Sequence, residues 1–241
     1  MNLCIVIPCY NEANRIPLSD FDKFLKNNLD VTLYFVNDGS SDKTQELLLN
    51  FKEKHSSNIE VIQLSKNLGK GNAVRQGMQR ALKNKDHNVF AFLDADLSTS
   101  LEECSQLSKL IQNKTSFVFG SRIKKMDNTI KRKWFRFLIG RMIATAISNA
   151  LQLAVYDTQC GCKLFSRKTA ELAFERAFIS SWLFDVEVFF RLKNHFGIAN
   201  FKAISSEVPL KNWKDQGDSK IKWTYGFKMW FDLLKIKREY P

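Results

Sequence analysis

The chain has little histidine and proline, and it has no long uninterrupted hydrophobic run. Its 241 residues include three histidines and four prolines. The most apolar long segment, 137–156, is interrupted by Arg141, Asn149 and Gln152, so it is a poor candidate for a transmembrane helix. The apolar stretch before Pro8 is too short for a secretion signal. We therefore expect a protein that is soluble or lies on a membrane without spanning it.

Cysteines are also few, and their number is odd: Cys4, Cys9, Cys104, Cys160 and Cys162. An odd count in a chain of this length does not indicate a disulfide framework. Cys160-x-Cys162 lacks the two-residue spacing that is typical of zinc sites. We expect reduced, mostly structural thiols and a cytosolic compartment.

The chain has fewer acidic than basic residues. Lysine and arginine number 37 against 25 aspartates and glutamates, which gives a formal net charge of +12 at pH 7. This excess favours an anionic partner, either nucleic acid, a phosphorylated substrate or an acidic membrane surface. No nucleic-acid recognition motif is visible, so we expect no nucleic-acid partner. The phosphate-binding signatures G-x₄-G-K-[ST] and G-x-G-x-x-G are missing too, which disfavours an ATPase and a dehydrogenase.

Short apolar runs alternate with helical patterns in the first half of the chain. Strands are expected over 3–7, 31–36, 60–64, 89–93 and 117–120, and helices over 18–28, 44–54 and 72–82. This alternation predicts an α/β fold with a mostly parallel sheet flanked by helices. A helix-period segment over 138–155 and a polar loop over 157–163 follow. No linker-like tract separates the halves, so we expect a single domain over 1–241.

The unusual polar residues gather where these strands are expected to end, in 8–12, 37–40, 67–71 and 94–96. Ligands bind at the carboxyl ends of parallel strands. Asp94-Ala95-Asp96 closes an apolar strand, and two such carboxylates can share one Mg²⁺ or Mn²⁺ with substrate phosphates. The alternative for this pair is a solvated turn.

Asp38 could accept the N–H groups of a uracil or guanine base, with Tyr10 stacking on the base and Glu12 as another acceptor. The alternative for Asp38 is an Asp-Gly turn followed by a helix cap. Lys70 and Arg75 follow the third expected strand among glycines, where cations suit a pyrophosphate. These features together predict a nucleotide site with a metal at the diphosphate.

As a set, these segments resemble the family 2 glycosyltransferases of the GT-A fold. The matching stretches are 6–12, 37–42, 67–71 with 73–77, and 94–98. A narrower match resembles the polyprenyl-phosphate sugar transferases, in particular the dolichyl-phosphate β-glucosyltransferase branch. Its residues are Gly120-Ser121-Arg122, 157–161, Lys163-Leu164-Phe165, and Trp182 with Phe184-Asp185-Val186-Glu187.

The resemblance implies an inverting transferase with a GT-A, Rossmann-like sheet. It would move a hexose, with glucose favoured, from a UDP-sugar to a polyprenyl phosphate, using Mg²⁺ or Mn²⁺. The implied nucleotide-binding residues are Pro8, Tyr10, Glu12, Asp38, Lys70, Arg75, Asp94 and Ala95. The implied catalytic residues are Asp94, Asp96, Asp157 and Asp185, with the metal on Asp96 and Asp94 and the acceptor phosphate on Arg122 and Arg132.

The sequence departs from the family pattern at several points. Asn37 stands where relatives often carry Asp, and Cys162 stands in place of a usual Phe. We expect this protein to lack the amino-terminal membrane anchor of the eukaryotic glucosyl enzymes. No Gln-x-x-Arg-Trp occurs, which disfavours a processive polysaccharide synthase.

The resemblance divides the expected domain into a nucleotide-sugar part, 1–123, and an acceptor and membrane-facing part, 124–241. The second part carries two apolar stripes with helical spacing. The first comprises Leu138, Met142, Ile143, Ala146, Ile147, Ala150, Leu151 and Ala154, and the second Trp223, Phe227, Trp230 and Leu234 among basic residues. Such a carboxyl-terminal amphipathic helix suits an anionic membrane surface, on the inner face of the membrane. The alternative is that both stripes pack on the core or on a second subunit in a homo-oligomer.

Four alternatives to this function stay open. Two lie within the family: a transferase with a soluble or cell-surface glycan acceptor, and a GDP-mannose-using polyprenyl-phosphate mannosyltransferase. A nucleotidyltransferase would need a glycine-rich basic turn after the first strand, which 8–12 does not provide. A non-catalytic membrane-surface binding module would not need Asp94 and Asp96.

Overall fold

The computed structural model describes residues 2–131, 134–214 and 225–240, with the backbone alone described for 131, 134–139 and 225–227. Arg132 and Trp223, which the sequence assigned to the acceptor phosphate and to the second stripe, therefore lie outside the described residues.

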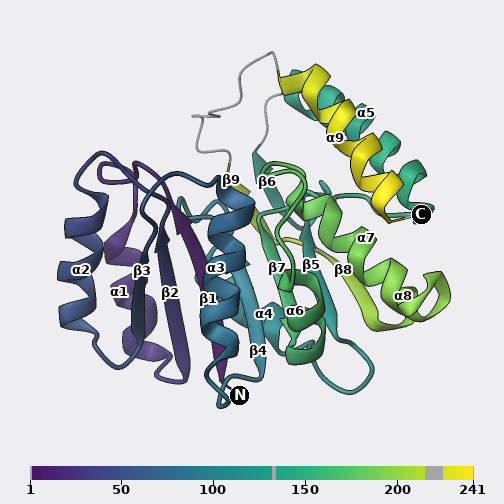
Figure 1. The fold of residues 1–241 in the computed structure, drawn as a ribbon. Coiled ribbons are helices and arrows are strands. Elements are labelled where there is room, and N and C mark those ends of the chain that lie inside the picture. The colour runs from purple at the N-terminus through teal and green to yellow at the C-terminus, as the bar shows by residue number, and fades with distance from the viewer. Residues whose placement is uncertain (1, 132–133, 215–224, 241) are drawn as a thin grey trace.

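A seven-stranded sheet forms the centre of the molecule, in the order β3-β2-β1-β4-β7-β5-β8 (Figure 1). Its strands are β1 (Leu3–Cys9), β2 (Val31–Asn37), β3 (Ile59–Gln63), β4 (Val89–Leu93), β5 (Phe117–Ser121), β7 (Cys162–Ser166) and β8 (Ser205–Pro209). All run in the same direction except β7, which is antiparallel to both of its neighbours. The prediction of a mostly parallel sheet is thus confirmed, although the sequence did not indicate β7.

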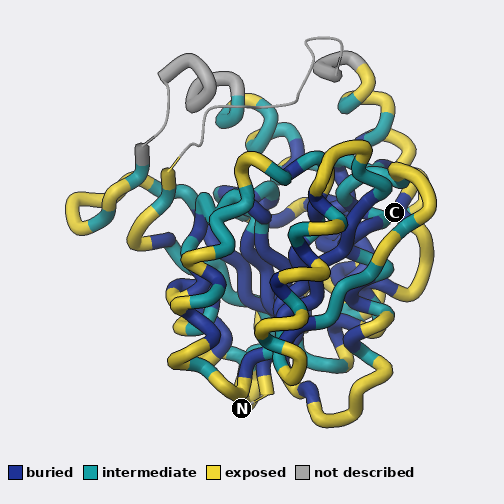
Figure 2. Tube along the Cα trace, turned by 90° about the vertical axis from the view of Figure 1, so that its left-hand side faces the viewer, coloured by how far each residue is buried: buried dark blue, intermediate teal, exposed yellow. Residues whose placement is uncertain are grey.

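Helices cover both faces of this sheet (Figure 1). They are α1 (Leu18–Asn27), α2 (Thr44–Lys54), α3 (Lys70–Leu82), α4 (Leu101–Ser108), α5 (Trp134–Leu151), α6 (Arg167–Phe174), α7 (Phe184–Phe196), α8 (Ile198–Ile204) and α9 (Tyr225–Glu239). One hydrophobic cluster joins a sheet face to α3, α6 and α7, and a second joins the other face to α1, α2 and α4. Buried residues gather in the centre of the molecule, and exposed residues lie on its outside, in helices and in loops (Figure 2).

The central strand β4 shows why these sequences form strands. Phe90 and Phe92 point into one cluster, while Val89, Ala91 and Leu93 point into the other. The period of two places successive side chains on opposite faces. Because both faces are covered by helices, every position is apolar, as is usual for parallel sheets.

The helix expected over 138–155 is displaced toward the amino terminus, because α5 ends at Leu151. Gln152 has a φ of 56°, in the left-handed region that terminates helices. The N–H of Leu153 then donates to the carbonyl of Ser148 at 3.2 Å, which closes the end of the helix.

The helices α5 and α9 lie side by side beyond one end of the sheet (Figure 1). Of the first stripe, Ile147 and Leu151 are buried, whereas Met142 is exposed. Among the residues of α9 whose side chains are described, Leu233 and Ile236 are buried, and Trp230 and Leu234 of the second stripe are exposed. Within the described ranges, no helix combines the length and the apolar character needed to cross a membrane.

A small sheet of two parallel strands, β6 (Thr129–Lys131) and β9 (Asn212–Lys214), lies apart from the central sheet. The N–H of Lys214 donates to the carbonyl of Ser98, in the loop after β4. The carboxylate of Glu103 on α4 accepts the N–H groups of Lys211 and Asn212. These bonds fasten β9 beside the carboxyl end of β4.

Candidate active site

Four residues with positive φ angles follow four neighbouring strands of the sheet. They are Asn11 after β1, Gly39 after β2, Gly69 after β3 and Leu97 after β4, with φ between 50° and 84°. Such angles are uncommon for residues other than glycine and gather at functional sites. They lie at the edge of the sheet where these strands end, within or directly beside the polar segments 8–12, 37–40, 67–71 and 94–96.

Asp38 joins two of these loops. It is buried, and its two carboxylate oxygens accept the N–H groups of Leu68 at 2.7 Å and Gly69 at 2.9 Å. Burial raises the pKa of Asp38, and the two amide donors offset only part of that rise. Asp38 therefore holds the loop after β2 against the loop after β3, and its predicted contact with a base remains a prediction.

Asp94 is enclosed from two sides. The Nζ atom of Lys70, the first residue of α3, lies 2.5 Å from the Oδ1 atom of Asp94. On the other side, a Cβ atom added to Gly161 would lie 2.1 Å from the Oδ2 atom of Asp94. Only glycine fits this approach of the backbone at 161 to the carboxylate. Burial disfavours the Lys70 ammonium, but Asp94 and Asp185 more than offset this and raise its pKa.

Asp185 receives a second buried cation. Lys163 is the second residue of β7 and its side chain is fully buried, with the Nζ atom 2.5 Å from the Oδ1 atom of Asp185. The same ammonium donates to the carbonyl of Cys160 at 2.7 Å. Burial raises the pKa of Asp185 despite the nearby charges of Lys163 and Lys70.

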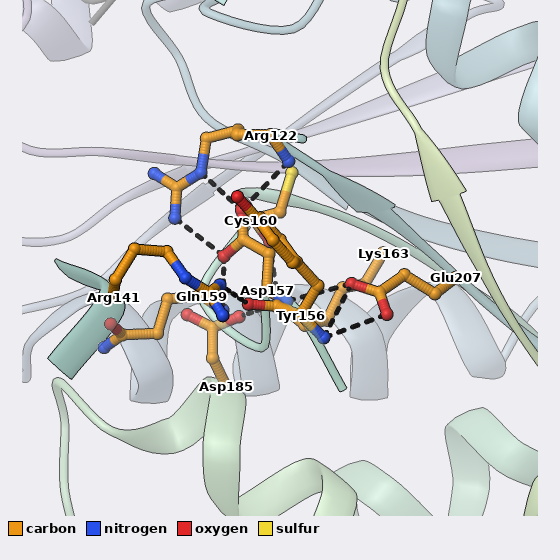
Figure 3. Close-up of polar contacts among 9 residues, drawn as sticks. All are labelled: Arg122, Arg141, Tyr156, Asp157, Gln159, Cys160, Lys163, Asp185 and Glu207. Atoms are coloured by element: carbon orange, nitrogen blue, oxygen red, sulfur yellow. Dashed lines mark hydrogen bonds and ion pairs between the residues drawn. The ribbon is translucent and has the colours of Figure 1, made fainter. Parts of the chain in front are cut away.

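Asp157 forms the third ion pair, with Arg122 at the end of β5 (Figure 3). The Nε and one terminal nitrogen of Arg122 reach the two carboxylate oxygens at 2.6 and 2.8 Å, a bidentate arrangement. The guanidinium also lies 5.4 Å from the ring centroid of Trp213 on β9. Burial alone would raise the pKa of Asp157, but Arg122 reverses this and lowers it to about 2.

The three pairs form one electrostatic cluster. Asp94 and Asp185 both stabilise the charged form of Lys70, and Asp94 also acts on Arg122. The cluster therefore unites Lys70, Asp94, Arg122, Asp157 and Asp185 from the predicted site. Asp96, two residues beyond Asp94, accepts the N–H of Ser98 at 2.9 Å.

The other predicted residues lie at varying distance from this cluster. Pro8 is part of β1, Tyr10 is 38% exposed after it, and buried Glu12 pairs with Arg15 at 3.2 Å. Ala95 is buried between the two aspartates. Arg75 is engaged elsewhere, because its guanidinium donates to the carbonyl of Glu175 beyond α6.

Four residues that contact the cluster or its supporting loop had no predicted site role: Lys163, which the sequence showed only as part of the family match, and Trp213, Arg141 and Glu207. Lys163 had one available signal, since a lysine inside an otherwise apolar strand needs a partner. The other three lie on α5, β8 and β9, and their contacts depend on how distant elements pack.

Comparison with known proteins identifies the family. The model of glycosyl transferase family 2 matches residues 4–172. The chain belongs to this family. It is 33% identical to a dolichyl-phosphate beta-glucosyltransferase of Trichomonas vaginalis over 96% of this chain and 69% of that protein. It is also 30% identical to the human dolichyl-phosphate beta-glucosyltransferase, over 99% of this chain and 75% of that protein.

Solved structures confirm the GT-A fold of this family 2 glycosyltransferase. Glucosyl-3-phosphoglycerate synthase from Mycobacterium tuberculosis, in complex with Mn²⁺ and UDP-glucose, superposes with a TM-score of 0.69. The match has 16% identity and covers all of this chain and 80% of that one. At this identity the likeness establishes the fold alone.

The carboxylates of the family 2 transferase fit a substrate-bridging divalent cation. In the described part of the chain, no group of three His, Cys, Asp or Glu side chains could hold a metal ion. Asp94 and Asp96 nevertheless end the same strand as hard oxygen ligands. Mg²⁺ is commonly bound by one or two carboxylates plus substrate phosphates, rather than by a full protein cage. Asp94 and Asp96 therefore fit a divalent cation as two of its ligands.

The Asp157–Arg122 pair predicts how stability depends on acidity. A carboxyl with a pKa lowered from about 3.9 to about 2 contributes roughly 2–3 kcal/mol, present above pH 4 and lost as the pH falls through 2. We expect the parent protein to be more stable than Asp157→Asn at pH 7, with about half of this contribution lost by pH 3. Urea unfolding of both proteins across this range measures the difference. A difference that stays constant from pH 7 to pH 3 would contradict the assignment.

Proposed function

We propose that this glycosyltransferase moves glucose from UDP-glucose to a polyprenyl phosphate. The observation that carries the proposal is the cluster of ion pairs at the carboxyl edge of the sheet, which sets Asp94 and Lys70 beside an oriented Arg122. A nucleoside diphosphate and a phosphate acceptor both need cations, and this edge supplies them side by side. The names of the relatives support a lipid phosphate acceptor and glucose. The complexes of the structural neighbour support UDP-glucose as the donor.

On the donor side, the loops after β1 to β4 would hold the nucleotide, with Asp38 at the base and Lys70 at the diphosphate. Lys70 also opens α3, so the amino-terminal end of the helix dipole faces the same anion. Asp94 and Asp96 would hold the metal, which neutralises the charge of the departing UDP when it is bound.

On the acceptor side, Arg122 would hold the lipid phosphate. Asp157 uses the Nε and one terminal nitrogen of Arg122, so the second terminal nitrogen remains for the phosphate. A lipid phosphate is already ionised at pH 7 and needs no general base to activate it. Its oxygen forms the new bond to the anomeric carbon as the bond to the UDP oxygen breaks on the opposite face, which inverts the configuration.

Transfer of radiolabelled glucose tests this function directly. The purified chain is incubated with labelled UDP-glucose, Mn²⁺ and undecaprenyl or dolichyl phosphate in detergent. We expect label in the lipid extract, in a product from which mild acid releases glucose. Parallel incubations replace the donor with labelled GDP-mannose or the acceptor with a soluble glycan, and label transferred only in one of these would favour that alternative within the family.

A second prediction concerns the metal. If Asp94 and Asp96 hold it against the diphosphate, UDP should bind more tightly with Mn²⁺ than with EDTA, and Asp96→Ala should abolish that difference. Calorimetry measures both affinities, and circular dichroism checks that the variant is folded. Asp20→Ala, at an exposed position of α1, is the control and should retain the metal effect. Metal-independent binding of UDP by the parent protein would refute the role of the pair.

We also propose that the outer side of α5 and α9 lies on an anionic membrane. Four large apolar side chains are exposed there: Met142 at 75%, Trp230 at 47%, Phe231 at 66% and Leu234 at 53%. Exposed Lys228, Lys235, Lys237 and Arg238 accompany them on α9. Apolar and basic side chains on one amphipathic helix match an interface of anionic lipid, and such a surface would bring the enzyme to a lipid acceptor.

Sedimentation with vesicles tests this surface. We expect the protein to bind phosphatidylglycerol vesicles at low salt and to release them at high salt, since each basic residue near the surface contributes about 1 kcal/mol that salt screens. Lys228→Glu with Trp230→Glu should weaken binding and leave the affinity for UDP unchanged. Leu49→Glu with Lys54→Glu, on exposed positions of α2, makes the same charge change and should have little effect. Absence of vesicle binding by the parent protein would exclude this surface.

A further inference from the structure

The backbone of Tyr156 and Asp157 is held by a carboxylate from the edge of the sheet. Glu207, in the middle of β8, accepts the N–H of Tyr156 at 3.1 and 3.0 Å through its two oxygens (Figure 3). Its Oε1 atom also accepts the N–H of Asp157 at 2.9 Å. One side chain thus binds two consecutive amides, 50 residues away in sequence.

The position of Glu207 is a costly one for a charge. Its half-buried side chain lines a pocket of about 310 Å³ whose other walls are mostly apolar, among them Phe119, Phe189 and Phe201, but also include Lys202. In the part of the chain that the structure describes, no cation forms an ion pair with it. A charged group that is partly withdrawn from water is stabilised when hydrogen bonds compensate its lost hydration. Here that compensation comes from the amides of Tyr156 and Asp157.

The same peptide segment is held from its other side by α5. The guanidinium of Arg141 donates to the carbonyl of Tyr156 at 2.8 Å and lies 3.8 Å from the centroid of its ring. Glu207 and Arg141 therefore bind the N–H groups and the carbonyl of this segment from two different elements (Figure 3). The segment is fixed immediately before the carboxylate that orients Arg122.

We propose that Glu207 is a positioning residue for the acceptor site, acting through the backbone of Asp157 on Arg122. The Asp157 carboxylate accepts the backbone N–H of Arg122 as well as two N–H groups of its guanidinium, so a shift of residue 157 shifts the guanidinium. In the described part of the chain, Glu207 forms no hydrogen bond or ion pair with the loops after β1 to β4, so its loss should act on the acceptor side first and reach Asp94 only through the 157–161 loop. The inference rests on the proposed function in taking Arg122 as the ligand of the acceptor phosphate.

Three variants test this proposal: Glu207→Ala, Glu207→Gln and, as a control, Glu60→Ala. Glu60 lies on β3, the opposite edge strand, and pairs there with Lys52. We expect Glu207→Ala to raise the KM for undecaprenyl phosphate by about tenfold. A displacement on the order of 1 Å can cost a reaction about a hundredfold in rate, and a smaller shift of the Arg122 guanidinium should weaken phosphate binding by less. Its affinity for UDP with Mn²⁺ should change much less than this KM, because Glu207 binds residues 156 and 157 and not the nucleotide loops. Glu207→Gln keeps one carbonyl oxygen as an acceptor and should fall between the two, whereas Glu60→Ala should match the parent.

Hydrogen exchange followed by mass spectrometry supplies a readout that does not depend on the reaction. Glu207→Ala should exchange faster in peptides that cover 154–160, with peptides of β1 and β4 unchanged. Unchanged exchange over 154–160 would overturn the proposal, and so would faster exchange with an unaltered acceptor KM. Equal losses of donor and acceptor binding would also overturn it, because Glu207 would then serve general stability. If the parent transfers no glucose to any polyprenyl phosphate, the proposed function fails, and the exchange result still decides whether Glu207 fixes this segment.

Discussion

The buried ammonium of Lys163 is the constraint on which the site depends. A charged lysine at the centre of a sheet costs several kcal/mol unless it is paired and hydrogen-bonded. Here Asp185 supplies the countercharge from the first turn of α7, so this helix end must lie against β7. The second partner of the Lys163 ammonium is the carbonyl of Cys160, so the loop over 157–161 also lies beside this ammonium. That loop then brings Gly161 against Asp94 and Asp157 against Arg122.

The sequence was most informative where a local pattern decides the structure. β1 to β4 and α1 to α3 lie within two residues of their predicted bounds, because each strand combines an apolar run with a polar turn. Asp94, Asp157, Asp185 and Arg122 were identified as site residues, and the fold brings them together. Their partners within the cluster were not all foreseen, since Lys163 reaches Asp185 only because β7 enters between β4 and β5 in the opposite direction. No local pattern encodes that insertion.

Other differences between the prediction and the structure also arise from contacts between segments that are distant in sequence. The polar sequence of β8 does not look like part of a sheet, yet it pairs with β5 as an edge strand. Arg75 carries the charge that a diphosphate would need, but packing between α3 and α6 directs it to the carbonyl of Glu175. In each case a contact between distant segments outweighs what the nearby residues indicate.

The positive charges of the cluster and the excess positive charge of the chain lie in different parts of the molecule. Within the cluster each of Lys70, Lys163 and Arg122 is matched by one aspartate, so these side chains contribute little to the net charge of +12. The excess lies outside the cluster, in part on the exposed side of α9. Long-range attraction of anionic partners therefore comes from the outer surface, while the cluster provides short-range orientation.

The links that build the cluster span long stretches of chain, and this has a consequence for biosynthesis. Arg122 and Asp157 are 35 residues apart in sequence, and Glu207 follows Asp157 after a further 50 residues. Contacts of such separation form late, after the loops between them have closed. During translation, the first four strands can emerge and pair while the acceptor side of the site still lacks its edge strand. Until then the nascent chain has an unpaired β5 edge, where association with another chain or with a chaperone would compete with native folding.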